Sequence, residues 1–157
     1  MRREIMSNFG LERRVNRCGT ACATFGYAPQ AVNTIAAGGF IPYNVVIENL
    51  SKRCCDLDIK LNTGSGDIFI REAGKYQIAV RLDVPGVADT YIEVTTGNGA
   101  TARASIYSLA GEMVFDLFVK RDSVIKVVVG GTGPIVFTPG TDTSIPMSII
   151  AITKLEA

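Results

Sequence analysis

The sequence predicts an all-β protein, an antiparallel two-sheet jelly-roll sandwich of about ten strands that follows an extended N-terminal arm. From residue 40 onward, short segments of alternating apolar and polar residues are separated by turns rich in glycine and proline. Apolar residues make up 47% of the chain, enough for a packed core, and the 16 glycines suit many tight turns. No segment after residue 40 has the spacing of apolar residues that is typical of an amphipathic helix. Such frequent turns favour antiparallel hairpins over a parallel α/β sheet.

The clearest pair of strands lies within residues 65–84. Ile68 and Ile70 are apolar residues of the first strand, and a turn at Gly74 follows. In the second strand, every second residue from 76 to 84 is apolar, and the residues between them are mostly polar. This period of two is typical of a strand with one buried face and one solvated face, so we expect a long core strand here.

Further strands are predicted on both sides of this pair, each a short alternating segment bounded by turn residues. Residues 124–129 are almost all β-branched, which predicts a strand covered on both faces. The other expected strands span residues 44–48, 54–61, 91–95, 101–108, 113–119, 135–137 and 147–153.

Residues 1–39 differ in composition from the rest and are predicted to form an anchoring arm, with residues 40–157 as the head. Residues 1–17 hold five arginines and two glutamates, and residues 18–39 contain no charged side chain and are mostly small. Such a segment cannot form a core of its own, so it is either a flexible linker or an arm laid against a partner. We expect the arm, with arginines pairing to carboxylates and aromatic side chains as anchors. The expected partner-binding residues are Arg2, Arg3, Arg13, Arg14, Arg17, Phe25 and Tyr27.

The residue types present argue against an enzyme. The chain has no histidine, which removes the commonest general base and the commonest metal ligand. No catalytic triad, Cys-His pair or carboxylate pair is evident. The run Gly130-Gly131-Thr132-Gly133 lacks the lysine and the helix of a phosphate-binding loop, so it predicts a hairpin turn. We expect no catalytic residue and no cofactor.

The four cysteines do not form a recognisable metal site. Cys18 and Cys22 are separated by three residues, and Cys54 and Cys55 are adjacent, whereas zinc sites usually contain cysteine pairs separated by two residues. In a reducing compartment such cysteines are plain thiols. We therefore expect no bound metal and no requirement for Cys18 or Cys22 in folding.

Charge and hydropathy limit the choice of partners. The formal net charge is +1, so nothing in the overall balance indicates nucleic-acid binding. No apolar run approaches the roughly 20 residues of a membrane span, and the first ten residues lack the apolar core of a signal peptide. We expect a protein made in the cytoplasm that neither binds nucleic acid nor inserts into a membrane.

Three segments of the head resemble the strand signatures of tumour necrosis factor-like and complement globular-head jelly rolls. The first is Ile70-x-x-x-Gly74-x-Tyr76-x-Ile78. The second, residues 119–124, contains an Arg-Asp turn that leads into a strong β run. The third, residues 147–154, is similar to the closing strand of bacterial spore-surface collagen-like glycoproteins, although their collagen stalk is missing.

The resemblance implies a jelly roll that associates as a tight homotrimer; the alternative is a monomeric sandwich. We expect a non-enzymatic structural protein that residues 1–39 attach to a larger particle. The particle we favour is a bacteriophage virion assembled in the host cytoplasm, where such heads occur as capsid decorations or head fibres. The alternatives are a spore-coat or exosporium protein on the spore surface and a soluble carbohydrate-binding jelly-roll module.

If the head faces outward from a particle, two of its loops are available to bind a host-surface glycan or protein. These are the loops after the strands that end near residues 84 and 95. The expected receptor-facing residues are Pro85, Gly86, Asp89 and Asn98.

Overall fold

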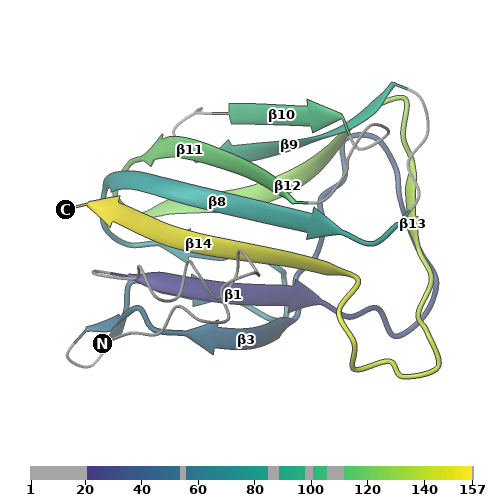
Figure 1. Cartoon of the computed structure of the whole chain (residues 1–157), viewed down its shortest axis with the longest axis horizontal. Helices are drawn as coiled ribbons and strands as arrows, with labels where there is room; N and C mark the ends of the chain where they lie inside the picture. Colours follow the sequence, from purple (N-terminus) through teal and green to yellow (C-terminus); the bar gives the residue numbers. More distant parts are fainter. Residues whose placement is uncertain (1–20, 54–55, 85–88, 98–100, 106–111, 157) are drawn as a thin grey trace.

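The computed structural model describes residues 21–53, 56–84, 89–97, 101–105 and 112–156, and all the regular structure in these ranges is β (Figure 1). The predicted fold class is confirmed: two five-stranded antiparallel sheets pack face to face, and two two-stranded sheets lie beside them. The described part of the chain contains no helix with the length and apolar character that crossing a membrane requires.

Each five-stranded sheet joins strands that are distant in the sequence, as a jelly roll requires. Sheet I, in the front of Figure 1, has the order β11-β8-β14-β1-β3, and sheet II has the order β10-β9-β12-β7-β6. The strands of sheet I are β11 (Met113–Val119), β8 (Gly74–Leu82), β14 (Ser148–Glu156), β1 (Cys22–Tyr27) and β3 (Val45–Asn49). Those of sheet II are β10 (Thr101–Ser105), β9 (Thr90–Thr96), β12 (Ser123–Gly131), β7 (Ile68–Ile70) and β6 (Ile59–Leu61). The small sheets pair β2 (Asn33–Ile35) with β13 (Ile135–Phe137) and β4 (Lys52–Arg53) with β5 (Asp56–Leu57).

The core lies between the two sheets and is filled by alternate residues of each strand. In β8 the predicted alternation is confirmed, since every second residue from Tyr76 to Leu82 is buried. In β12 the prediction of a strand covered on both faces is wrong: Ile125, Val127 and Val129 are buried, and the residues between them are partly exposed. The β-branched residues of β12 therefore reflect strand propensity as well as burial.

The predicted boundary between arm and head at residue 40 is corrected by β1. This strand lies in sheet I between β14 and β3, and all six of its residues are buried. Phe25 and Tyr27, expected to anchor an arm, belong to the core of the head, and Phe25 pairs in register with Ile150 of β14. The small, uncharged residues that suggested an arm are those that a strand buried on both faces requires. The head therefore includes residues 21–39.

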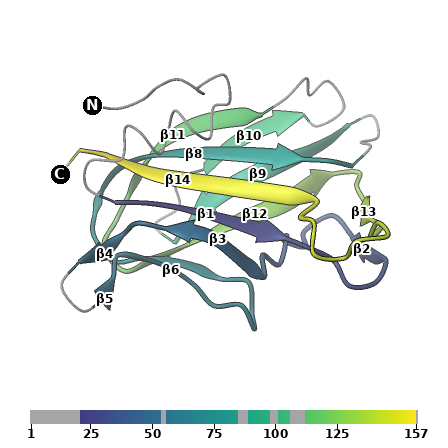
Figure 2. The same cartoon turned by 60° about the horizontal axis from the view of Figure 1, so that its bottom comes forward.

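The strands run between two ends of the sandwich that differ in how they are closed. At the turn end, short connections such as residues 71–73 and 120–122 join a strand of one sheet to a strand of the other. At the loop end, β2, β13 and the segment between β13 and β14 cover the opening (Figure 2). The strand β1 begins at the turn end, where the amide of Lys154 near the end of β14 donates to the carbonyl of Ala21 over 2.8 Å.

A buried chain of hydrogen bonds fixes the start of β14. The Ser148 hydroxyl donates to the carbonyl oxygen of Arg81 over 3.0 Å, which leaves the Tyr43 hydroxyl to donate to Ser148 Oγ, also over 3.0 Å. Burial raises the pKa of Tyr43 well above its usual value, more than the hydrogen bond with Ser148 lowers it. Tyr43 therefore remains neutral and ties the connection before β3 to the sheet.

If β1 is part of the core, truncating its aromatic side chain should destabilise the whole head. We expect Phe25→Ala to lower the free energy of unfolding by about 3–5 kcal/mol, because it leaves a cavity between the sheets. Phe69→Ala is the matched control: Phe69 is 42% exposed, so its loss should cost at most about 1 kcal/mol. Urea denaturation of the two variants measures both values. Equal, small effects would show that β1 is dispensable, as an arm would be.

Candidate functional site

The outer face of sheet I carries large apolar side chains that a single copy of the chain leaves exposed. Phe115 and Leu117 of the edge strand β11 pack against the core, whereas Val114 and Phe118 point to the other face and are 48% and 57% exposed. A sheet that faces water normally has polar residues on its outer side. Apolar residues on both faces of β11 therefore indicate a second covering partner.

Small residues continue this face across the middle of the sheet. Val114 pairs in register with Ala79 of β8, and Ala79 pairs with Ala151 of β14. In β1, Gly26 is closely approached: a Cβ atom there would lie 2.9 Å from Cβ of Pro146 and 3.3 Å from Cδ1 of Ile47. Ala79 and Ala151 are nevertheless buried, so the exposed apolar side chains of this face lie toward its edges and not at its centre.

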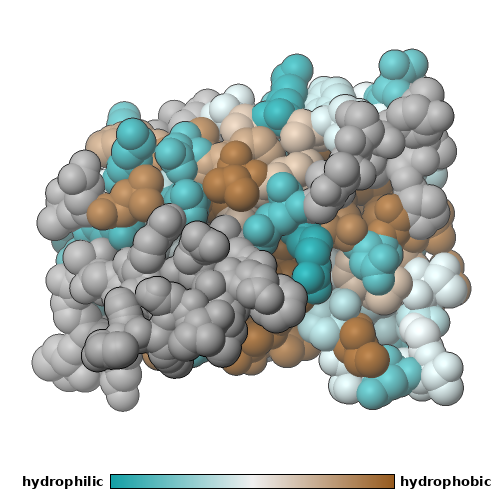
Figure 3. All heavy atoms as spheres, viewed as in Figure 1, coloured by the Kyte–Doolittle hydropathy of each residue, from teal (hydrophilic) through white to brown (hydrophobic). Residues whose placement is uncertain are grey.

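The opposite edge of sheet I is also apolar. Val46 and Ile47 of β3 are exposed, and Ile47 lies over Gly26, so it belongs to the same outer face. Figure 3 shows apolar surface over β8 and β11, interrupted by hydrophilic side chains. Charged residues of this face, such as Asp116 on β11, lie between the apolar ones. Both edge strands of sheet I thus present side chains suited to contact with another subunit.

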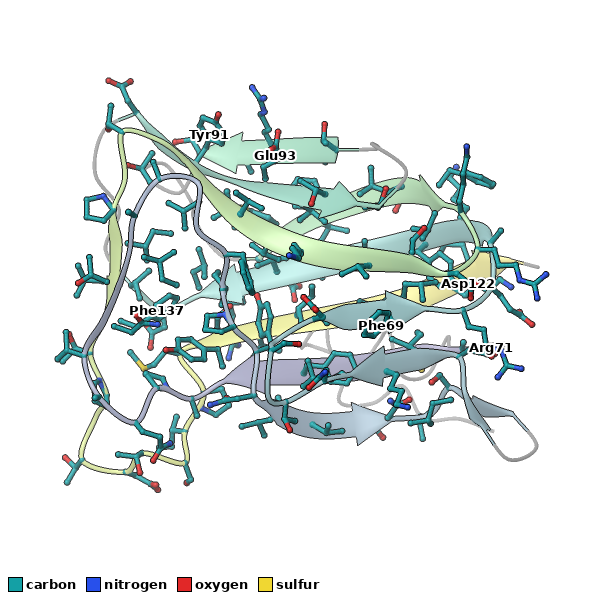
Figure 4. The ribbon with its side chains drawn as sticks, turned by 180° about the vertical axis from the view of Figure 1, so that it is seen from behind. Phe69, Arg71, Tyr91, Glu93, Asp122 and Phe137 are labelled. Carbon is teal, nitrogen blue, oxygen red and sulfur yellow. The ribbon has the colours of Figure 1, made fainter. Side chains whose placement is uncertain are left out.

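Sheet II differs in part: cations lie over the rings of Tyr91 and Phe40, although the Phe69 ring of β7 is 42% exposed. The Tyr91 ring lies against Gly130, where a Cβ atom would come within 2.2 Å of it, and the Arg103 guanidinium lies 5.1 Å from the ring centre. Arg103 Nε donates to Glu93 over 2.7 Å, which raises the pKa of Arg103. Figure 4 shows Tyr91 and Glu93 on this side of the sandwich. This arrangement is that of a solvated face.

The structure describes only some of the residues proposed for partner binding. Phe25 and Tyr27 are core residues; the five arginines expected to contact a partner lie outside the described residues. These arginines are Arg2, Arg3, Arg13, Arg14 and Arg17.

Of the proposed receptor-facing residues, the structure describes Asp89. Asp89 is exposed with a φ of 65°, at the loop end, and its carbonyl accepts the amide of Thr132 over 3.1 Å. The strand β9 starts next to Asp89 and ends at the turn end. Pro85, Gly86 and Asn98 lie outside the described residues.

The described ranges contain no cluster of side chains suited to a metal ion. No group of three or more His, Cys, Asp or Glu side chains is placed to hold a metal ion there. Gly130 and Gly131 end β12, and residues 132–134 connect it to β13. The predicted hairpin turn is wrong, because β13 pairs with β2 and not with β12. Apolar contact and charge are the chemistry that these surfaces provide.

The expectation of free thiols is wrong for Cys22, which is disulfide-bonded. Spacing alone did not reveal this bond, because an even number of cysteines is informative only when the compartment is known. Cys22 is the first residue of β1 and lies at the turn end of sheet I. The other three cysteines, Cys18, Cys54 and Cys55, lie outside the described residues.

Comparison with solved structures identifies the fold of this chain. An Eiger TNF from S. frugiperda aligns over 88% of this chain and 94% of its own with 15% identity and a TM-score of 0.58. Murine APRIL aligns over 86% of this chain and 98% of its own, with 9% identity and a TM-score of 0.58. Pika GITRL aligns over 86% of this chain and 96% of its own, with 12% identity and a TM-score of 0.51. The chain therefore has a tumour necrosis factor-like jelly-roll fold. Neither a protein-family model nor a curated protein sequence matches it.

The disulfide should contribute to the stability of the head. We expect Cys22→Ser to lower the free energy of unfolding by about 2–4 kcal/mol, because the cross-link restricts the unfolded chain. Urea denaturation with and without dithiothreitol measures this. Reduction should remove most of the difference, since both proteins then lack the bond. A variant as stable as the oxidised wild type would show that the bond has no structural role.

Proposed function

We propose that this chain is a non-enzymatic structural and binding protein whose jelly-roll head assembles as a homotrimer through the outer face of sheet I. The observation that carries the proposal is the pair of exposed apolar side chains on β11, Val114 and Phe118, on the side opposite the core. Burying them against another copy removes this apolar surface from water. The apolar edge at Ile47 of β3 supplies a second contact surface on the same face.

A closed ring of copies fits two different edges on one face. Contact between the β11 edge of one copy and the β3 side of the next is heterologous, and a heterologous contact is satisfied in every copy only when the ring closes. The tumour necrosis factor-like jelly rolls that the sequence resembles form homotrimers, which supports three copies. This assembly has no need of catalytic chemistry, in keeping with the lack of histidine in the sequence.

We further propose that the segment before residue 21 attaches this trimer to a larger particle. Residues 1–17 hold five arginines and two glutamates, and the chain enters β1 at the turn end. The favoured particle is a bacteriophage virion, with the head as a capsid decoration or head fibre; a spore surface is the alternative. A disulfide at Cys22 suits a protein that functions outside the reducing cytoplasm, as both particles allow.

Introducing a charge on the outer face of sheet I should break the assembly. We expect the wild type to have about three times the monomer mass of 16.8 kDa by light scattering, and Phe118→Glu to shift it to monomer at micromolar concentration. Burying an unpaired carboxylate in an interface weakens association by at least about 30-fold. Phe69→Glu is the control, because Phe69 is similarly exposed but lies on sheet II. A monomeric wild type, or equal loss of assembly in both variants, contradicts the proposal.

Attachment should depend on the basic segment. Changing Arg13, Arg14 and Arg17 together to glutamate should weaken co-sedimentation with purified particles by about 10- to 100-fold, through the loss of three ion pairs and the repulsion that replaces them. Wild-type attachment should also weaken with added salt. Purified virions and purified spores, tested separately, identify the particle. A variant that sediments like the wild type would show that the segment is not the attachment site.

A further inference from the structure

The two ends of the sandwich carry opposite charge. The described residues of the connections at the loop end, residues 28–44, 62–67, 83–84, 89, 112 and 132–147, contain no lysine or arginine. They contain five acidic residues. These are Asp67, Asp83, Asp89, Glu112 and Asp142. The turn end carries exposed cations instead, namely Arg71, Lys75, Lys120 and Arg121.

The cations of the turn end come from two adjacent turns. The amide of Asp122 in the turn between β11 and β12 donates to the carbonyl of Arg71 in the turn between β7 and β8, over 3.2 Å. Figure 4 shows Arg71 and Asp122 at this same end. Lys75 pairs in register with Phe118, so it lies on the rim of the outer face of sheet I, close to both turns. The two turns therefore form one patch.

Ion pairs within the patch leave two lysines uncompensated. Arg121 Nε lies 3.7 Å from Asp122, and the half-buried Glu72 receives the Lys154 ammonium at 2.9 Å. Neither Lys75 nor Lys120 has an ion pair within the described ranges. Their charge is thus free to attract an anion. In the sequence, the arginine-bearing residues 1–17 precede β1, and the first residue of β1 lies at this same end.

We propose that the turn end faces an acidic protein surface and that Lys75 and Lys120 extend the contact begun by the N-terminal arginines. An acidic partner would repel the loop end, so the charge difference also fixes the orientation: the loop end points away from the partner. This inference rests on the proposed attachment function and specifies the chemistry of the partner.

A carboxylate-bearing protein fits this patch better than nucleic acid or a sulfated glycan. The patch is a mosaic, because Glu72 and Asp122 lie among its cations, and Leu155 adds an exposed apolar side chain at the same end. A uniform polyanion would meet these carboxylates and gain nothing from the apolar groups. A folded acidic surface can match both.

Carbodiimide cross-linking of the full chain to poly-L-glutamate tests the orientation, because it joins lysine ammonium groups to nearby carboxylates. Peptide mapping should find Lys75 and Lys120 cross-linked several-fold more than Lys60, an exposed lysine on sheet II without an ion pair in the described ranges. Cross-linking of Lys60 at the same level would overturn the proposal, since the turn end would then have no preference for carboxylates.

Matched charge reversals test the contribution to affinity. Lys120→Glu should weaken binding to immobilised poly-L-glutamate by about 3- to 10-fold at low salt, and Lys60→Glu by less than about 2-fold. If Lys120→Glu and Lys60→Glu weaken binding to the same extent, the proposal is overturned. Tighter binding to polyphosphate or heparin than to a glutamate–tyrosine copolymer of equal charge, which offers both carboxylates and apolar groups, would assign the patch to phosphate or sulfate and overturn the choice of a protein partner.

The arginine reversal described above separates this inference from the proposed function. If changing Arg13, Arg14 and Arg17 abolishes attachment to particles and Lys120→Glu binds them like the wild type, the segment attaches the head and the turn end does not. That result overturns only the inference. If neither variant changes attachment to any particle, the proposed function fails as well.

Discussion

Strand β1 is the constraint on which sheet I depends, because it has hydrogen-bonded neighbours on both sides and buried residues throughout. It pairs with β14 along six residues and with β3 across an irregularity between Thr24 and Phe25. Without it, β3 would lose its place in the sheet and the edge of β14 would be open. The uncharged segment that suggested an arm thus holds the β3 side of sheet I together.

The sequence predicted most of the strands that have one face exposed to solvent and the other buried. The alternation in β8 and the turn glycines between strands gave the fold class and most strands, because a period of two records which face meets the core. The same rule could not identify β1, whose two faces are both buried and whose residues therefore do not alternate in polarity. It also joined β5 and β6 into one strand, although buried Asp58 separates them and bonds through its backbone to Ser51 and Arg71.

The sequence predicted that an apolar strand face would be available for contact, but not which face. High apolar content indicated surplus strand faces, but the face that stays exposed depends on which edge strand is outermost, and this follows from long-range pairing. Val114 and Phe118 read in the sequence like any alternating apolar residues; their exposure is evident only once β11 is at the edge of sheet I. The disulfide at Cys22 was likewise beyond prediction, because spacing does not show which thiols meet.

Apolar and charged surfaces lie on different parts of this molecule. The apolar edges lie along the side of the sandwich, whereas the loop end is acidic and the turn end carries exposed cations. In the proposed assembly, lateral contacts between heads would depend on apolar burial, and contacts made through an end would depend on ion pairing, which salt screens. An assembly built this way would lose its attachment as ionic strength rises while its subunits remain together. That separation follows from the strand direction alone, because every turn of a jelly roll lies at one end or the other.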